Sequence, residues 1–373
     1  MAKRDDVLAG FPPKISIDIP PAYQTDAKSP SATGSSPSTA RSPAQGCQSP
    51  GRRRKSKNIR ATVHDFLREC LTQQSPWSEE QCRAMLAQCA ELCKGSKLDV
   101  SELIQEPFIE GRVLVYWAIL KRSWQEGASS SDPAAADGLT MALLAESERT
   151  GIAPQTIEDV RHACVALSDD ALFQRVRRRF HAFSPTLSGA EKMLLRSNGV
   201  STDFVDTAYV VEGLGDGTTF SASLELPLFQ LRMRVVKKLS VEFIANGRLW
   251  RLALDVDKGG VWRATLGIAA HSQKAYIDVV LSVKEVSPEA NPSQCTPVAG
   301  SRYVSIALKS LLSPLVAGYK REVTQRLDAT TMAAALQAKS TTYIDASGTL
   351  KAKLAGRVQS RKPPSEGDGC IIC

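Results

Sequence analysis

Cysteine and histidine are the side chains that most often bind metals or act as nucleophile and base. The chain of 373 residues contains nine cysteines and four histidines. Cys82, Cys89 and Cys93 are close enough in sequence to suggest a metal site, but they recur with Met85, Leu86 and Leu92 at helical spacing on one apolar face, which favours buried thiols. No CxxC motif has a second pair or a nearby histidine, as zinc sites require. The histidines are scattered, at His64, His162, His181 and His271.

We therefore predict a protein without metal, cofactor or enzymatic activity. A catalytic triad can assemble from residues that are far apart in sequence, so the scattered histidines lower the odds of catalysis without excluding it.

Serines that precede proline could accept phosphate. Residues 1–58 are rich in Ser, Pro, Thr, Gly and Ala and cannot bury enough apolar surface to fold, so we expect a disordered arm. Proline-directed kinases act on such extended segments, and Ser49-Pro-Gly-Arg52 also has the basic residue favoured by cyclin-dependent kinases. We predict phosphorylation here, with plain low-complexity composition as the alternative. The four candidates are Ser29, Ser36, Ser42 and Ser49.

A run of basic residues follows the last of these serines. Such a run is typical of a nuclear import signal, a membrane-surface patch or a solvated linker, and the sequence does not separate the three. A phosphate on Ser49 would add nearly two negative charges beside the run and weaken either kind of binding. The run consists of Arg52, Arg53, Arg54, Lys55 and Lys57.

The last four residues, Cys370-Ile-Ile-Cys373, resemble a CaaX box, the signal for prenylation. The resemblance implies that a zinc-dependent transferase binds the Cys370 thiolate and attaches the lipid there, and that the three following residues are then removed. Cys373 departs from the usual Ser, Met, Gln, Ala or Leu, which leaves farnesyl versus geranylgeranyl undecided. A terminal CxxC redox or metal pair and simple chance are the alternatives.

One lipid chain gives only marginal membrane binding, so we expect a second signal. Basic residues lie just upstream in a segment, residues 340–373, that we predict to be a flexible tail. Each can add up to about 1 kcal/mol of attraction to an anionic membrane surface. They are Lys351, Lys353, Arg357, Arg361 and Lys362.

The distribution of charge locates this attraction in the two arms. Residues 1–58 hold ten Lys/Arg against four Asp/Glu, and residues 340–373 hold five against three, which accounts for the whole net charge of +8. The remainder is neutral, which argues against a specific nucleic-acid-binding domain. No apolar run approaches the ~20 residues of a membrane helix, and the start lacks a signal peptide's apolar centre. We therefore expect a cytoplasmic, peripheral membrane protein, or a nuclear one.

The elements between the arms change from helical to strand-like. Apolar residues from Ile59 onward recur at helical spacing, and capping boxes at Ser78 and Ser188 open two of the helices, which predicts an all-helical domain over residues 59–200. Arg175, Arg177, Arg178 and Arg179 form a basic helix end that we expect to be solvated, with a phosphate or acidic partner as the alternative. The spacing of Val316, Tyr319, Val323 and Leu327 predicts a C-terminal helix over residues 313–339.

Alternating apolar residues predict an antiparallel β-sandwich over residues 203–312, with strands that include 228–236 and a last one near 303–311. The Gly213–Gly217 segment predicts a hairpin, and Asn246-Gly247 and Lys258-Gly259-Gly260 predict turns. Between the last two turns, Trp250, Leu252 and Leu254 share one sheet face with Phe243. The fold class is therefore α+β.

Two stretches resemble known families. An aromatic, a Gly turn and a Trp-led strand in Val241–Gly260 are similar to the MATH (TRAF-type) β-sandwich, which implies binding of a protein or peptide without catalysis; an unrelated sandwich is the alternative. Gly111-Arg112 leading to Tyr116-Trp117-Ala118 is similar to the opening of an ankyrin repeat, although no second copy follows.

These observations predict a non-enzymatic adaptor that binds a protein or peptide and is held at an anionic, cytoplasmic membrane surface by prenylation of Cys370. The alternative is a nuclear regulatory protein that is directed by the basic run at residues 52–57 and gated by phosphorylation of Ser49.

Overall fold

A computed structural model describes most of the chain after residue 49. The chain divides into two units, Met1–Gln48 and Ser49–Cys373, and all described residues belong to the second. The described residues are 50–72, 77–125, 137–184, 187–199, 202, 204–213, 218–270, 272–285, 303–310, 313–318, 321–327 and 341–359.

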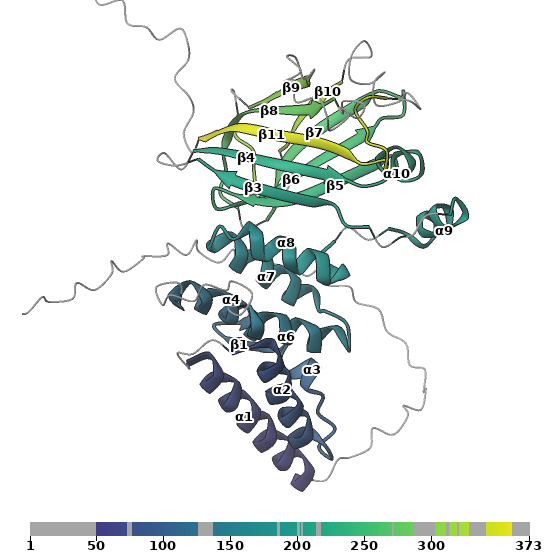
Figure 1. Cartoon of the computed structure of the whole chain (residues 1–373). Helices are drawn as coiled ribbons and strands as arrows, with labels where there is room; N and C mark the ends of the chain where they lie inside the picture. Colours follow the sequence, from purple (N-terminus) through teal and green to yellow (C-terminus); the bar gives the residue numbers. More distant parts are fainter. Residues whose placement is uncertain are drawn as a thin grey trace, which may run out of the picture. The chain divides into compact units, whose positions relative to one another are not determined.

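The first half of this unit is helical, as predicted (Figure 1). Both predicted capping boxes form, with the hydroxyls of Ser78 and Ser188 accepting from the backbone N–H groups of Gln81 and Glu191. A short hairpin of β1 (Pro107–Ile109) and β2 (Arg112–Val113) precedes α4. The helices are α1 (Pro50–Thr72), α2 (Glu79–Cys93), α3 (Val100–Leu103), α4 (Leu114–Gln125), α6 (Gly138–Glu148), α7 (Pro154–Ala166), α8 (Asp170–Arg179), the 3-10 turn η1 (His181–Phe183) and α9 (Gly189–Ser197).

The second half forms two antiparallel sheets, so the α+β class is correct. The four-stranded sheet has the order β10-β7-β6-β5, and the five-stranded sheet has the order β3-β4-β11-β8-β9. The bounds are β3 (Thr207–Glu212), β4 (Thr219–Leu226), β5 (Lys238–Ala245), β6 (Arg248–Val256), β7 (Trp262–Ile268), β8 (Tyr276–Lys284), β9 (Tyr303–Lys309), β10 (Val323–Arg326) and β11 (Leu350–Gln359), with helix α10 (Phe229–Val236) between β4 and β5.

The two sheets share one hydrophobic core. Phe220 of the five-stranded sheet stacks on Trp250 of the four-stranded sheet with ring centroids 5.8 Å apart, and it lies 6.0 Å from Phe243. Leu252 and Leu254 line the same core, so the predicted common face is confirmed. Asn246 and Gly247 both have positive φ, and β3 pairs with β4, as the predicted turn and hairpin require.

The opposite face of the four-stranded sheet packs on the helices. Ile244, Leu249 and Ala269 point away from the sandwich core and belong to the core of the helical half. Contacts of α8 with β5 and of α7 with β6 join the halves (Figure 1). The predicted domains at residues 59–200 and 203–312 are therefore parts of one compact unit.

The prediction of a strand over residues 228–236 is wrong, because this segment is helix α10. Its apolar and polar residues alternate, which favours a strand, but Phe229, Arg232 and Met233 are buried together, and their spacing is helical. Arg232 donates two hydrogen bonds to Asp206, at 2.5 and 2.8 Å, and so stabilises the helical arrangement.

The predicted boundary at residue 312 is also wrong. Val323–Arg326 forms β10 beside β7, where a helix was predicted over residues 313–339; residues 328–340 lie outside the described part. The predicted flexible tail at residues 340–373 contains β11, which lies between β4 and β8 in the centre of its sheet. The sandwich therefore runs from Thr207 to Gln359, and the strand near residue 303 is not the last one.

The predicted disordered arm at residues 1–58 ends earlier than expected. Helix α1 begins at Pro50, so the basic run at residues 52–57 lies in the first turns of a helix and is not a linker. Val63, Leu67 and Cys70, further along α1, are buried in the helical core. Their burial against α2 and α4 provides the packing that allows the helix to extend back to Pro50.

Candidate functional site

The outer face of the five-stranded sheet carries part of the predicted basic cluster. Lys351, Lys353 and Arg357 alternate along β11 with the buried Ala352, Leu354 and Val358, so all three point away from the core. All three are exposed. The strand pairing thus gathers on one surface three of the five cations predicted near the tail.

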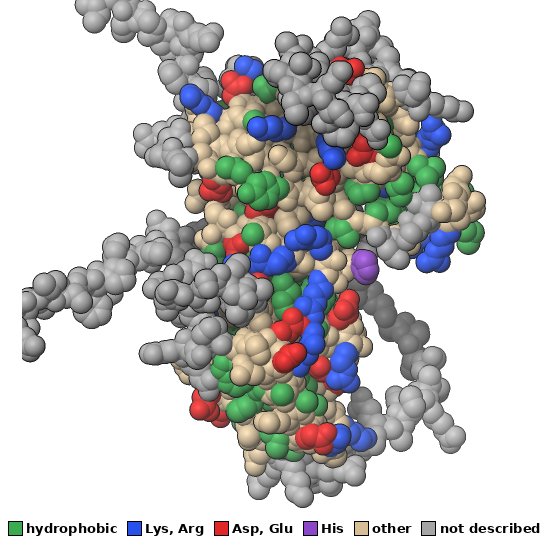
Figure 2. All heavy atoms as spheres, viewed as in Figure 1, with side chains coloured by type: hydrophobic (Ala, Val, Ile, Leu, Met, Phe, Trp, Pro, Cys, Tyr) green, Lys and Arg blue, Asp and Glu red, His purple; other side chains and the backbone are tan. Residues whose placement is uncertain are grey.

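The strand register arranges the residues around these cations in rows. One row crosses the sheet as Tyr209, Ser223, Lys353, Ser282 and Ser305, and the next as Val211, Ser221, Ala355, Val280 and Ala307. Tyr209, Val211 and Val280 are 70%, 53% and 38% exposed. Figure 2 shows hydrophobic side chains exposed over β3, with basic side chains over the neighbouring strands. The face is therefore a mixed apolar and cationic surface made mostly of small residues.

Ion pairs leave a positive excess on this face. Lys309 pairs with Asp278 at 3.1 Å, and Lys351 lies 3.9 Å from Glu225. Within the described residues, Lys353 and Arg357 are in no ion pair. Among the residues that the structure describes, two cations of the face therefore have no acidic partner, which suits a negatively charged surface.

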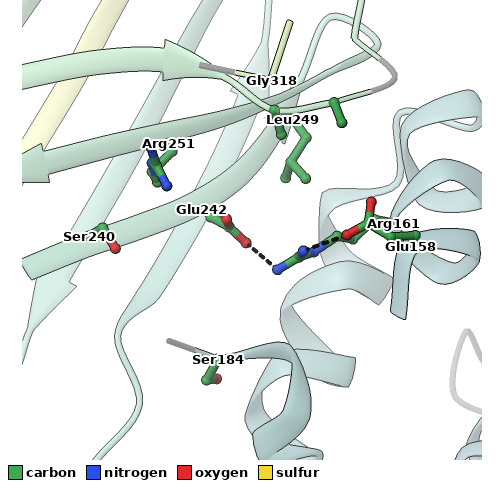
Figure 3. A pocket seen from close by; sticks show the side chains of 10 residues that line it. Glu158, Arg161, Ser184, Ser240, Glu242, Leu249, Arg251 and Gly318 are labelled. Carbon is green, nitrogen blue, oxygen red and sulfur yellow. Dashed lines mark hydrogen bonds and ion pairs between the residues drawn. The ribbon is translucent and has the colours of Figure 1, made fainter. Parts of the chain in front are cut away.

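An open pocket of about 500 Å³ lies between the helices and the four-stranded sheet (Figure 3). Arg161 of α7 lies between two carboxylates, donating to Glu242 of β5 at 3.2 Å and to Glu158 at 3.1 Å. Arg251 of β6 also lines the pocket and pairs with Glu322 at 3.2 Å. The pocket is therefore polar, and its two guanidinium groups are both paired with acids.

The lining of the pocket offers several hydrogen-bonding groups. Its remaining residues are Ser184, Ser240, Leu249, Ala269, Ala270 and Gly318. The Ser184 hydroxyl donates to the backbone oxygen of Arg177 at 3.2 Å, so its proton is held by a carbonyl and not by a base. Guanidinium, carboxylate and hydroxyl groups around an open hollow can hydrogen-bond the polar groups of a peptide.

Polar side chains of α8 complete the backbone hydrogen bonding of β5, the edge strand of its sheet. The Asp170 carboxylate accepts from Ile244 N at 2.8 Å. The Glu242 carbonyl accepts from Gln174 Nε2 at 3.0 Å and from Arg177 Nη1 at 2.8 Å. Because these donors and acceptors cover the edge, β5 is not free to pair with another strand. Arg177 is only 1% exposed, so the prediction of a solvated basic end is wrong for this residue.

Burial changes the ionisation of this contact. The pKa of Asp170 is raised to about 6, mainly because the carboxylate is removed from water; the hydrogen bonds from Gln174 and Ile244 and the positive charge of Arg177 act in the opposite direction. Burial also lowers the pKa of Arg177, although nearby acids raise it.

The cysteines of α2 are buried thiols, as predicted. Cys82, Cys89 and Cys93 point into the helical core, and burial raises the pKa of Cys82 and of Cys89 to about 11. Such thiols are poor nucleophiles and poor metal ligands at neutral pH. Across the described ranges, no group of three or more His, Cys, Asp or Glu residues is arranged to hold a metal ion.

Most of the other predicted site residues are not tested. The four candidate phosphorylation sites, Cys370, Arg361 and Lys362 all lie outside the described residues. Lys57 is exposed on α1, which packs on α2 and α4, whereas β11 packs on β4 and β8. Helix α1, which carries the basic run, therefore packs in the helical core, whereas β11, which carries the other cations, packs in the sandwich core. No helix of the described part is both long and apolar enough to cross a membrane.

Sequence reasoning missed the pocket, the role of Arg177 and the exposed apolar residues of β3. Glu242 and Arg161 are 81 residues apart, and no local pattern connects them. The alternation of Ala208 and Val210 with Tyr209 and Val211 could have shown that both faces of this strand carry apolar residues.

No protein-family model matches this chain, and no curated protein is significantly similar to it.

Proposed function

We propose that this protein is a non-enzymatic adaptor that binds a protein or peptide while a prenyl group on Cys370 holds it to the cytoplasmic face of a membrane. The position of β11 supports the proposal. Its exposed cations Lys351, Lys353 and Arg357 share one sheet face. The eleven residues that follow Gln359, up to and including Cys370, can span up to about 40 Å, so a lipid at Cys370 and this face can reach the same bilayer.

The energetics require both parts. A single prenyl chain gives marginal and reversible membrane binding. The two cations without an acidic partner among the described residues, Lys353 and Arg357, add up to about 2 kcal/mol near an anionic leaflet, or about thirtyfold in partitioning. Together they give stable residence, and the pocket beside Arg161 and Arg251 remains as a binding place for a peptide.

The modification itself is a substitution at carbon. The Cys370 thiolate attacks the first carbon of an isoprenyl diphosphate, a C–S bond forms, the C–O bond breaks, and pyrophosphate leaves with the electron pair. The thiol proton is lost to solvent or base. The proposal requires that Cys373 is the last residue of the chain that the transferase meets.

Fractionation of cells that express Cys370→Ser tests this proposal. We expect the wild-type protein in the membrane fraction, and we expect Cys370→Ser to shift largely to the soluble fraction because it has lost the lipid. Cys373→Ser is the matched control, because it also loses a terminal thiol but keeps Cys370 and has a usual last residue. Mass spectrometry of the mature carboxyl end should show a thioether on Cys370. An unmodified thiol on Cys370, or a Cys370→Ser variant that is retained on membranes as fully as the wild type, would contradict the proposal.

A further inference from the structure

Helix α9 exposes apolar side chains that the fold does not use. Its capping box and the complete burial of Leu195 fix the helix against the rest of the unit, where it contacts α10. Met193 is 72% exposed and Leu194 is 51% exposed. Two large aliphatic side chains in succession on a folded helix therefore face solvent.

Exposed cations lie on α9 itself and on α10, the helix that α9 contacts. Lys192 and Arg196 are exposed on α9, and Arg234 and Lys237 are exposed at the end of α10, the helix on which α9 packs. Within the described residues, no ion pair involves any of the four. Glu191 is the acidic residue of α9, and its carboxylate accepts from Ser188 N in the capping box. Figure 2 shows basic and hydrophobic side chains together at α9, at the right of the view.

This combination fits an anionic lipid surface. Aliphatic side chains can enter the boundary between headgroups and acyl chains, while the long stems of Lys and Arg let their charges reach the phosphates. A second copy of the chain is a poor occupant, because a two-fold contact would bring the same cations together. We call Lys192, Met193, Leu194, Arg196, Arg234 and Lys237 the α9 patch.

We infer that the α9 patch is a second membrane contact, which inserts Met193 and Leu194 into an anionic leaflet. The inference rests on the proposed function and adds to it the part of the folded body that touches lipid. It also supplies the additional signal that a single prenyl chain needs for stable binding.

Binding to vesicles tests the inference without the lipid anchor. The full-length chain with Cys370→Ser is mixed with vesicles of phosphatidylcholine alone or of equal parts phosphatidylcholine and phosphatidylserine, and the bound fraction is measured by co-sedimentation. We expect binding to the vesicles that contain phosphatidylserine. Adding Met193→Ser and Leu194→Ser should weaken it at least about tenfold. Leu92→Ser is the matched control, because Leu92 is 52% exposed on α2, and it should bind like the parent.

Charge reversal provides an independent measurement. Arg234→Glu with Lys237→Glu should weaken binding by about fivefold or more for each residue, whereas Lys274→Glu, an exposed cation of another loop, should have little effect. Circular dichroism confirms that each variant is folded. Unchanged binding of the α9 patch variants, or equal binding of the parent to both kinds of vesicle, would overturn the inference. None of these results bears on the modification of Cys370, which fractionation and mass analysis decide separately.

Discussion

Asp170 and Arg177 show how single buried polar residues join the two halves of the molecule. Both are on α8, and both bind backbone groups on the open edge of β5. A buried polar group costs free energy unless it is hydrogen-bonded. Here Asp170 and Arg177 are hydrogen-bonded to backbone groups of β5 that would otherwise be buried without partners. Each of these hydrogen bonds therefore satisfies a buried side chain and a buried backbone group at the same time.

The raised pKa of Asp170 predicts a stability that depends on pH. In the folded protein the pKa is about 6, against an ordinary value of 3.8. The Asp170 carboxyl therefore binds its proton more tightly in the folded state than in the unfolded state. This tighter binding adds fully to the free energy of unfolding below about pH 4, and the contribution is lost as the pH rises through about 6. Asp170→Asn keeps an oxygen that can accept from Ile244 N but does not ionise.

We expect the free energy of unfolding of Asp170→Asn, relative to wild type, to increase by on the order of 2–3 kcal/mol between about pH 4 and about pH 7.5. Urea unfolding at several pH values measures this difference. Asp65→Asn serves as control, because the Asp65 side chain is 72% exposed, and its difference from wild type should stay flat. If the free energy of unfolding of Asp170→Asn relative to wild type were also independent of pH, burial would not be raising the pKa of Asp170.

At the scale of elements, β11 determines whether the five-stranded sheet is complete. It pairs with β4 on one side and with β8 on the other, and Leu350, Ala352, Leu354 and Val358 fill the core between the sheets. Without it, both neighbours would become edges with unpaired backbone groups, and the core would lose four side chains.

Two truncations test the importance of this strand. A chain that ends at Gln359 should fold and melt like the full-length protein, because it keeps every strand of the described sandwich. A chain that ends at Ser340 should lose the cooperative transition of the sandwich and aggregate. Thermal unfolding followed by circular dichroism distinguishes the two. A shorter chain that is as stable as the longer one would contradict the central position of β11.

At the scale of the whole unit, the four-stranded sheet belongs to two cores. One face packs in the sandwich, and the other places Ile244, Leu249 and Ala269 among the helices. Separating the halves would expose these side chains and leave the edge of β5 without α8. We therefore expect the helices and the sheets to unfold as one cooperative unit.

Hydrogen exchange measured by mass spectrometry at increasing urea concentration tests this cooperation. Peptides from α4 and from β6 should lose their protection at the same urea concentration. The variant Arg177→Met, which removes a buried donor to Glu242, should lower that concentration for both peptides, whereas Arg178→Met, at an exposed neighbour, should change neither. Protection that is lost in one half well before the other would show two independent domains.

The sequence by itself determined the features that depend on neighbouring residues. Spacings of a few residues predict the helix faces, the capping boxes at Ser78 and Ser188, the turn at Asn246-Gly247 and the burial of the α2 cysteines, because the interacting groups lie within one or two turns of chain.

Tertiary structure decided the rest. Leu350–Gln359 becomes a central strand because β4 and β8, whose paired residues are at least 69 positions away in the register, offer it backbone partners. Phe229–Val236 becomes a helix because its buried residues fit a core formed by other elements. Arg161 and Glu242 come together only when distant segments pack, and no periodicity in the chain predicts that contact.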